Sequence, residues 1–335
     1  MRQIVMTGPR KSTVVDVPIP KCGENQLLVK VTYTGMCHSE CRLWSTAKGG
    51  ETFGHETVGV VAEVGKNVNG FKVGDRVTGL GGGGYREYIL MEPHKTCHVP
   101  DNLKDEDAMV EPLACLMSAA IKMMPEKPGD PIAVVGCGYM GLGMISLFKL
   151  CGYGKIVAID KRQEALDSAK KFGATECYLP QDIPEKYILN WQTMRGKLDL
   201  SRDGTNAMLF ATGLPNVMEF AGTEDGLQLA GDLVCAHGRL GVGGFHNEPR
   251  DNETPPVRSV CFSLWNFKAF TLINCHERRI IYEAGLCQRC LDMLGSGQWK
   301  FTGLTTHFYN MEEFDKGNED MIAHNGNFIK GAVRC

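Results

Sequence analysis

The chain has 335 residues, of which 43% are apolar and 22% charged, so its composition is that of a folded globular protein and excludes a disordered or collagen-like one. The 36 basic and 39 acidic side chains leave a net charge of −3, which provides no basic field to attract nucleic acid. Because no apolar run reaches about 18 residues, we expect no membrane-spanning helix.

The start of the chain and its cysteines indicate the cellular compartment. The first 20 residues lack the apolar core of a secretory signal peptide, so we expect a cytoplasmic protein. The 14 cysteines are scattered, several of them within apolar runs, where a free cysteine behaves as a small buried hydrophobe. We therefore expect reduced thiols and a metal site rather than a disulfide framework.

Residues 1–118 are predicted to form a β-rich domain. Short β-branched stretches at 27–34 and 57–64 are typical of strands, and glycines, including the run 81–84, separate such stretches as turns. At about 150 residues per domain, the chain has room for roughly two domains. We expect the second domain to cover 119–275 and the segment 276–335 to return to the first.

The pattern beyond residue 119 predicts a doubly wound parallel sheet. Short apolar stretches alternate with helical ones after a Pro-Gly-Asp turn at 128–130, and this alternation is typical of Rossmann-like α/β domains. The segment 181–205 is predicted as a helical excursion or a loop, and the segment 246–258 as a loop. The expected strands are 131–136, 155–160, 206–212, 232–237 and 269–275, and the expected helices are 139–150, 162–172 and 278–294.

A glycine motif follows the first of these strands. Gly136, Gly138 and Gly141 fit G-x-G-x-x-G between a strand and a helix, and Asp160 ends the next strand 19 residues later. In a dinucleotide site, such glycines allow a tight turn, close approach of the pyrophosphate and helix–strand packing. The N-terminus of the helix then binds the phosphates. The alternative is a glycine-rich turn without a ligand, in which Asp160 only caps the end of a strand.

The residue at the end of the second strand bears on the choice of dinucleotide. Asp160 favours NAD over NADP because a carboxylate accepts hydrogen bonds from ribose hydroxyls and repels a 2′-phosphate. The positive charges of Lys161 and Arg162 directly after it act against this preference. Further cofactor-contact candidates adjoin the motif or follow the later strands: Tyr139, Met140, Arg162, Thr212, Gly243 and His276.

Metal-ligating residue types occur at three places in the first domain. Cys37 lies in Gly-Met-Cys-His-Ser-Glu, His55 and Glu56 lie in Gly-His-Glu, and Glu111 lies in Val-Glu-Pro-Leu. Thiolate, imidazole and carboxylate groups are zinc ligands, and a catalytic zinc keeps one position for water or substrate. Because His55 alone would be an ordinary hydrogen-bonded histidine, the prediction depends on the whole set.

The order of these motifs resembles that of the zinc-containing medium-chain alcohol and polyol dehydrogenases over nearly the whole chain. The pattern GHE-x2-G-x5-G begins at Gly54, and GDRV at 74–77, EPLA at 111–114 and the glycine motif at 136–141 follow it. The resemblance implies a GroES-like β-rich catalytic domain beside a Rossmann NAD-binding domain. Glu111, where some members have cysteine, is similar to the sorbitol and threonine dehydrogenase branches.

The resemblance implies a set of zinc ligands. Cys37 and His55 are ligands by this comparison, and Glu111 occupies the position of the third. Glu56 either binds the metal directly or lies just outside its ligands, and in a flexible site the two glutamates can exchange places.

The same resemblance implies a route for the substrate proton. Ser39 falls at the family's proton-relay position, and His38, beside the ligand cysteine, is a further relay candidate. The chain departs from the family pattern at Glu40 and Arg42, where an aspartate and a histidine are expected. Arg42 indicates either an acidic or phosphorylated substrate or a surface salt bridge.

Other clusters of cysteine and histidine are interpreted as packing. The family's structural zinc needs four closely spaced cysteines after GDRV, and residues 78–87 contain none, so we expect one catalytic zinc ion and no structural one. Cys287 and Cys290 lie in a helical pattern without a second cysteine pair, and the cluster at 94–98 is not needed for the expected ligand set.

The resemblance implies an NAD-linked, zinc-dependent enzyme that reversibly oxidises a secondary alcohol to a ketone. The expected substrate is a polyol, a sugar-like alcohol or an amino alcohol, and the expected assembly is a homodimer or homotetramer. A zinc-independent NAD(P)H reductase of the same fold is the first alternative. A non-catalytic nucleotide-binding protein with a relic metal site is the second.

Overall fold

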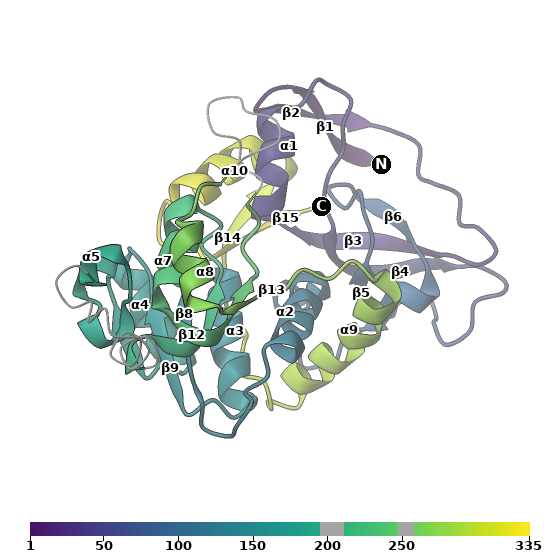
Figure 1. Ribbon diagram of the computed structural model, residues 1–335. Coiled ribbons are helices and arrows are strands. Elements are labelled where there is room, and N and C mark those ends of the chain that lie inside the picture. The colour runs from purple at the N-terminus through teal and green to yellow at the C-terminus, as the bar shows by residue number, and fades with distance from the viewer. Residues whose placement is uncertain (195–210, 247–257) are drawn as a thin grey trace. The chain divides into compact units, whose positions relative to one another are not determined.

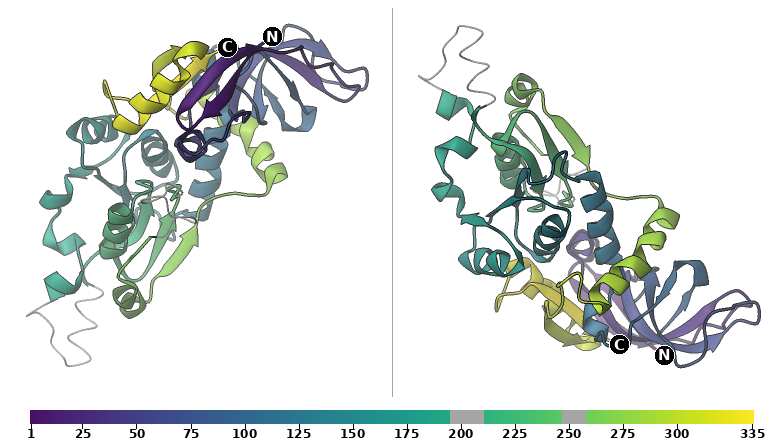
Figure 2. Two further views of the ribbon diagram at one scale, coloured as in Figure 1. Left: turned by 90° about the horizontal axis from the view of Figure 1, so that it is seen from above. Right: turned by 90° about the horizontal axis from the view of Figure 1, so that it is seen from below.

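A computed structural model describes residues 1–194, 211–246 and 258–335. The chain divides into two compact units, the first formed by Met1–Met117 with Glu277–Cys335 and the second by Ser118–His276. The C-terminal segment therefore belongs to the same unit as the N-terminal one, and Figures 1 and 2 show the two termini close together in it.

The first unit is built around a sheet. In its described residues, seven strands pair in the order β14-β15-β3-β4-β5-β7, with β6 also pairing with β3, and β1 and β2 form a separate antiparallel pair. The strands are β1 (Arg2–Gly8), β2 (Lys11–Asp16), β3 (Leu27–Gly35), β4 (Glu56–Val64), β5 (Arg76–Leu80), β6 (Tyr88–Met91), β7 (Thr96–His98), β14 (Thr305–Asn310) and β15 (Lys330–Arg334). The α-helices are α1 (Cys41–Ser45), α2 (Val110–Lys122, which continues into the second unit), α9 (Ile280–Gly295) and α10 (Phe314–Ala323). Short 3-10 helices are η1 (His38–Glu40), η2 (Pro93–Lys95), η3 (Asp105–Asp107) and η6 (Met311–Glu313).

Alternating apolar residues hold β3 in the core of this unit. Leu27, Val29 and Val31 lie two residues apart and are almost fully buried, as expected of a strand with one face on a core. They belong to a cluster with Val61, Val77, Ile89 and Met91 from the neighbouring strands. Because β3 and β4 are antiparallel, with Gly35 opposite Glu56, the end of one strand adjoins the start of the other.

The second unit is a doubly wound parallel sheet, as the sequence predicts. Its described strands pair in the order β10-β9-β8-β11-β12-β13, and every pair is parallel. Strand order reverses between β8 and β11, which is the Rossmann arrangement. The strands are β8 (Pro131–Val135), β9 (Lys155–Ile159), β10 (Glu176–Tyr178), β11 (Leu214–Glu219), β12 (Val234–Val242) and β13 (Thr271–Asn274). The helices are α3 (Tyr139–Leu150), α4 (Gln163–Phe172), α5 (Trp191–Met194), α7 (Glu224–Leu233) and α8 (Phe262–Lys268), with short 3-10 helices η4 (Pro180–Asp182) and η5 (Glu185–Tyr187).

The sequence does not predict the fourth strand of this sheet, β11, which runs through Leu214–Glu219. Most of the predicted strand 206–212 lies outside the described residues. Strand β11 contains Asn216, which interrupts the apolar pattern. In the fold Asn216 is 2% exposed and accepts a hydrogen bond from Arg239 Nε at 2.9 Å, so a tertiary contact satisfies a polar group that argues against a buried strand.

The other predicted helices and strands begin and end within a few residues of the observed ones. The strand predicted at 232–237 is β12, because residues up to Leu233 continue α7. The segment 181–205 contains η4, η5 and α5 up to residue 194, and the rest of it lies outside the described residues, as does 247–257 of the predicted loop. Within the described part of the chain, no helix is long and apolar enough to cross a membrane.

Candidate functional site

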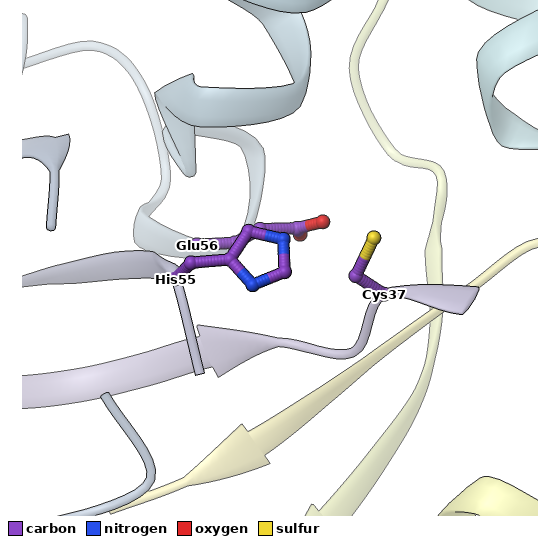
Figure 3. A group of neighbouring side chains, drawn as sticks. All are labelled: Cys37, His55 and Glu56. Atoms are coloured by element: carbon purple, nitrogen blue, oxygen red, sulfur yellow. The ribbon is translucent and has the colours of Figure 1, made fainter. Parts of the chain in front are cut away.

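Two strand ends bring three candidate ligands together. Cys37 follows β3, and His55 and Glu56 lie at the start of β4. One ligand atom from each of these residues lies within 4.8 Å of the other two, and Figure 3 shows the sulfur beside the imidazole ring and the carboxylate.

Glycines leave the space that this arrangement needs. A Cβ at Gly35 would lie 2.1 Å from Glu56 Oε2. Gly54 has a φ of +100°, and a Cβ there would lie 2.8 Å from the backbone nitrogens of Gly84 and Tyr85. The glycine of the Gly-His-Glu motif is thus required by backbone conformation and by close packing.

The cluster fits a zinc ion by the chemistry of its donors. A thiolate, an imidazole and a carboxylate are three of the ligand types that zinc uses, and a catalytic site with three protein ligands keeps a fourth position open. Glu56 is 1% exposed, and a buried carboxylate needs a cation or hydrogen bonds. Lys330 Nζ lies 2.7 Å from its Oε1 and 2.5 Å from its Oε2.

Charges within this cluster shift the pKa values of its members. Burial lowers the pKa of His55, but hydrogen bonds and charge interactions with Cys37 and Glu40 outweigh burial and raise the pKa to about 12. Burial likewise lowers the pKa of Lys330, whereas the charges of Glu56 and Cys37 raise it above its ordinary value. The anionic groups therefore make this a place where positive charge is stabilised.

Glu40 orients His55. In the sequence, Glu40 is notable only as a departure from the pattern of the resembling family. Its Oε1 accepts hydrogen bonds from Gly54 N at 2.9 Å and His55 Nδ1 at 2.8 Å, and its Oε2 accepts one from Tyr85 Oη at 2.9 Å. A carboxylate that holds one imidazole nitrogen fixes the ring and leaves the other nitrogen for a metal. The signal in the sequence is the position of Glu40, three residues after Cys37, where the resembling family has an aspartate.

The two relay candidates lie on η1, next to Cys37. Ser39 Oγ donates a hydrogen bond to Cys37 Sγ at 3.1 Å, so its hydroxyl adjoins the ligand cluster. His38 Nδ1 lies 3.7 Å from Cys41 Sγ.

Glu111 belongs to a second group of side chains. One ligand atom each of Glu111, Cys115 and Glu283 lies within 4.8 Å of the other two. Burial raises the pKa of Glu111, the charge of His55 lowers it, and the charge of Glu56 raises it. The pKa rises overall to about 7. Glu111 therefore lies close enough to the first cluster to interact with its charges, although it is not one of the three convergent donors.

The glycine motif forms the turn from β8 into α3. Gly136 has a φ of +92°, and a Cβ there would lie 2.5 Å from Ala221 N. A Cβ at Gly141 would lie 1.9 Å from Gly136 O, whereas Gly138 faces open space. The first residues of α3, Tyr139 and Met140, follow directly, so a helix N-terminus adjoins the tight turn, as a phosphate site requires.

Asp160 joins this turn to the end of β9. It is 8% exposed, and its Oδ2 accepts a hydrogen bond from Cys137 N at 2.8 Å. Its Oδ1 accepts hydrogen bonds from Arg162 N at 2.9 Å and Nε at 3.0 Å. Burial raises the pKa of Asp160, but the bonds from Arg162 and Cys137 outweigh it and keep the carboxyl group anionic.

The structure places Thr212 at the opposite edge of the parallel sheet from Gly243 and His276, which are also candidates for cofactor contact. Thr212 precedes β11 by two residues, so it lies at the amino end of that strand. The predicted strand before it lies mostly outside the described residues, so the role of Thr212 stays a prediction. Gly243 directly follows β12, and His276 lies two residues after the end of β13. Both are at the carboxyl edge, where dinucleotides bind to such sheets.

Glu219 is a residue of this edge that the sequence analysis did not single out. It ends β11, is fully buried, and accepts hydrogen bonds from Gly222 N at 2.7 Å and His246 Nε2 at 2.9 Å. A cavity of about 410 Å³ lies next to it, lined by Leu227, Val242, Gly244, Phe245, His246, Leu272, Asn274 and His276.

Comparisons with known proteins agree with this geometry. Residues 23–101 match the family described as the alcohol dehydrogenase GroES-like domain. A D-xylulose reductase A, named as probable, from Arthroderma otae is 26% identical, with 96% of this chain and 94% of the relative covered. L-threonine 3-dehydrogenase from Marinomonas sp. is 28% identical, with 96% of this chain and 94% of the relative covered. Sorbitol dehydrogenase from Bacillus subtilis is 28% identical, with 76% and 77% covered.

Solved structures share the fold at lower identity. Galactitol-1-phosphate dehydrogenase from Escherichia coli has a TM-score of 0.75 at 20% identity, with both chains fully covered. (2R,3R)-butanediol dehydrogenase from Bacillus subtilis has a TM-score of 0.73 at 20% identity, with 100% and 99% covered.

Residues 23–101 belong to the alcohol dehydrogenase GroES-like domain family. With a GroES-like unit that carries a zinc-type cluster and a Rossmann unit that carries a dinucleotide turn, the chain is similar over most of its length to zinc-containing medium-chain alcohol and polyol dehydrogenases. It is an oxidoreductase of that type, and zinc and a nicotinamide dinucleotide are the cofactors that its residues fit.

Proposed function

We propose that the protein reversibly oxidises a secondary alcohol of the polyol or sugar-alcohol class to a ketone, with NAD as the hydride acceptor and one catalytic zinc ion. The observation that carries the proposal is the convergence of Cys37, His55 and Glu56 within 4.8 Å. The names of the relatives, which act on xylulose, sorbitol and threonine, support a polyol first and an amino alcohol second.

The metal is held by Cys37, His55 and Glu56 in this proposal, with Glu111 outside the direct ligands. When bound, zinc supplies a Lewis acid that favours loss of the alcohol proton, and the nicotinamide ring supplies the hydride acceptor. Glu40 keeps His55 in position for this task, and Lys330 holds the carboxylate of Glu56.

The substrate proton leaves through the side chains beside the metal ligands. Ser39 is the first carrier, because its hydroxyl already donates to Cys37 Sγ and can both accept and release a proton. His38 is the second, since a histidine exchanges protons near neutral pH.

The dinucleotide binds along the carboxyl edge of the parallel sheet. Asp160 accepts hydrogen bonds from the adenosine ribose, which is the reason for proposing NAD. The pyrophosphate lies at the turn before α3, and Gly243 and His276 contact the other half of the cofactor. The residues assigned to the turn are Gly136, Gly138, Tyr139, Met140 and Gly141, with Arg162 beside Asp160.

Elemental analysis of the purified protein, together with a screen for NAD reduction, tests this function. The panel contains polyols, sugar phosphates and hydroxy amino acids. We expect one zinc ion per chain, turnover of at least one polyol, and loss of turnover when a chelator removes the zinc. A metal-free protein with full activity contradicts the proposal and favours the zinc-independent reductase.

We also propose a homodimer or homotetramer. Strand β13 ends the sheet order, and Leu272 on it is 51% exposed; an exposed apolar edge strand is a site for pairing with a second chain. Sedimentation of the wild type and of Leu272→Lys tests this assembly, which we expect the charge to weaken. The cytoplasmic location stays a prediction.

A further inference from the structure

Cys115 and Glu283 lie against Glu111. Neither residue is among the predicted metal ligands or the predicted cofactor contacts. Glu111 is in the first turn of α2, Cys115 follows one turn later on the same helix, and Glu283 lies on α9. Cys115 Sγ donates to Glu283 Oε1 at 3.0 Å and lies 3.7 Å from Glu111 Oε1. One thiol therefore bridges two carboxyl groups from two helices.

This group adjoins the Cys37–His55–Glu56 cluster. The charges of His55 and Glu56 act on Glu111, and the charge of Cys37 acts on Cys115. Glu283 is 8% exposed. Glu111 is partly buried. Two neighbouring carboxyl groups repel one another and are costly to bury unless a hydrogen bond or a cation offsets them. The thiol supplies the hydrogen bond, and the neighbouring cluster is the place for the cation.

We propose that Cys115 and Glu283 are positioning residues of the metal site, which hold the carboxyl group of Glu111 beside the Cys37–His55–Glu56 cluster and strengthen its retention of zinc. The inference rests on the proposed function, because it takes zinc as the metal. Groups that hydrogen-bond to the residues around a metal typically change its affinity by about 10- to 100-fold. The additional carboxylate also makes the electrostatic potential at the cluster more negative.

Competition with a zinc chelator measures the expected effect. We expect Glu283→Gln and Cys115→Val each to weaken zinc binding by about 10-fold or more. Cys115→Ser, which keeps a donor of similar size, should bind zinc nearly as the wild type does. The matched control is Asp292→Asn, since Asp292 is an exposed carboxylate on the same helix that bonds to Gln288 at 2.9 Å.

Cobalt substitution separates positioning from a general loss of structure. The thiolate-to-cobalt absorption should persist in all variants, because Cys37 is intact, whereas the ligand-field bands should shift in Glu283→Gln and Cys115→Val but not in Asp292→Asn. If Glu283→Gln does not fold, Glu283→Asp serves instead, with a smaller loss of zinc affinity expected.

Two results overturn the inference. The first is wild-type zinc affinity with an unchanged cobalt spectrum in Glu283→Gln and Cys115→Val. The second is a Cys115→Ser variant that loses zinc as readily as Cys115→Val, because the hydrogen bond would then be irrelevant. A wild type that binds no zinc contradicts the proposed function, and the inference with it, so the two failures are distinguishable.

Discussion

Single side chains in the first unit show what sequence motifs reveal and what they miss. The Gly-His-Glu motif and Cys37 predict three donors that the fold brings together. Glu283 has no such signal, since it lies 168 positions after Cys115 and nothing in its local pattern differs from an ordinary helical glutamate. Local motifs identify residues whose backbone is constrained, whereas long-range hydrogen bonds become visible only in the fold.

Asp160 is the residue at which dinucleotide preference can be tested. We expect Asp160→Ser to weaken NADH binding relative to NADPH binding by about 10-fold or more, because two changes act together. The ribose loses its carboxylate acceptor, and Arg162, which now bonds to Asp160, becomes available for a 2′-phosphate. Fluorescence titration with both reduced dinucleotides measures the change without reference to turnover.

The double variant Asp160→Ser with Arg162→Ala is the control for this experiment. The double variant should lose the NADPH affinity that Asp160→Ser gains. Its NADH affinity should differ little from that of Asp160→Ser. An unchanged NADH-to-NADPH ratio in Asp160→Ser would refute the role assigned to this carboxylate.

At the scale of elements, the antiparallel pairing of β3 and β4 creates the metal cluster. Their register sets Gly35 opposite Glu56, so Cys37 and His55 become neighbours although 17 residues separate them in the sequence. The sequence predicts both strands from their β-branched stretches, but it does not give the register that joins them. The same limit explains why the sequence does not predict β11, where the polar Asn216 interrupts the apolar pattern and finds its partner, Arg239, only in the fold.

Gly35→Ala tests this dependence on close packing. The new Cβ would lie 2.1 Å from Glu56 Oε2, so the carboxylate has to move, and overpacking of this kind costs about 1–3 kcal/mol. We expect weaker zinc binding and a lower melting temperature. Gly81→Ala is the matched control, because a Cβ at Gly81 meets nothing within 4 Å; equal zinc affinity in the two variants would contradict the prediction.

At the scale of the whole molecule, each of the two compact units contains apolar core clusters of its own. Alternation of strands and helices predicts the doubly wound unit correctly, because that pattern depends on local periodicity alone. Which buried polar groups support each core depends on tertiary contacts. Lys268 in the second unit is such a group, since it is fully buried and donates to the carbonyl oxygens of Gly231 and Asp232, both at 2.8 Å.

Lys268 should make the stability of the second unit rise with pH in the alkaline range. Burial lowers its pKa from 10.5 to about 8, although the charge of Asp232 acts in the opposite sense. Below pH 8 the amine is charged in both the folded and the unfolded chain, and the cost of burying that charge is fully present. Between pH 8 and pH 10.5 the unfolded chain binds more protons than the folded one, so the free energy of unfolding increases.

The gain amounts to about 3 kcal/mol over this range, at 1.36 kcal/mol for each pH unit between the two pKa values. Urea unfolding of the wild type and of Lys268→Met, from pH 7.5 to pH 10.5, isolates the contribution of this amine as the difference between the two curves. Lys161→Met, which removes an exposed lysine of the same unit, should follow the wild type throughout. A constant difference between wild type and Lys268→Met would mean that the amine titrates in the folded protein as it does in the unfolded chain.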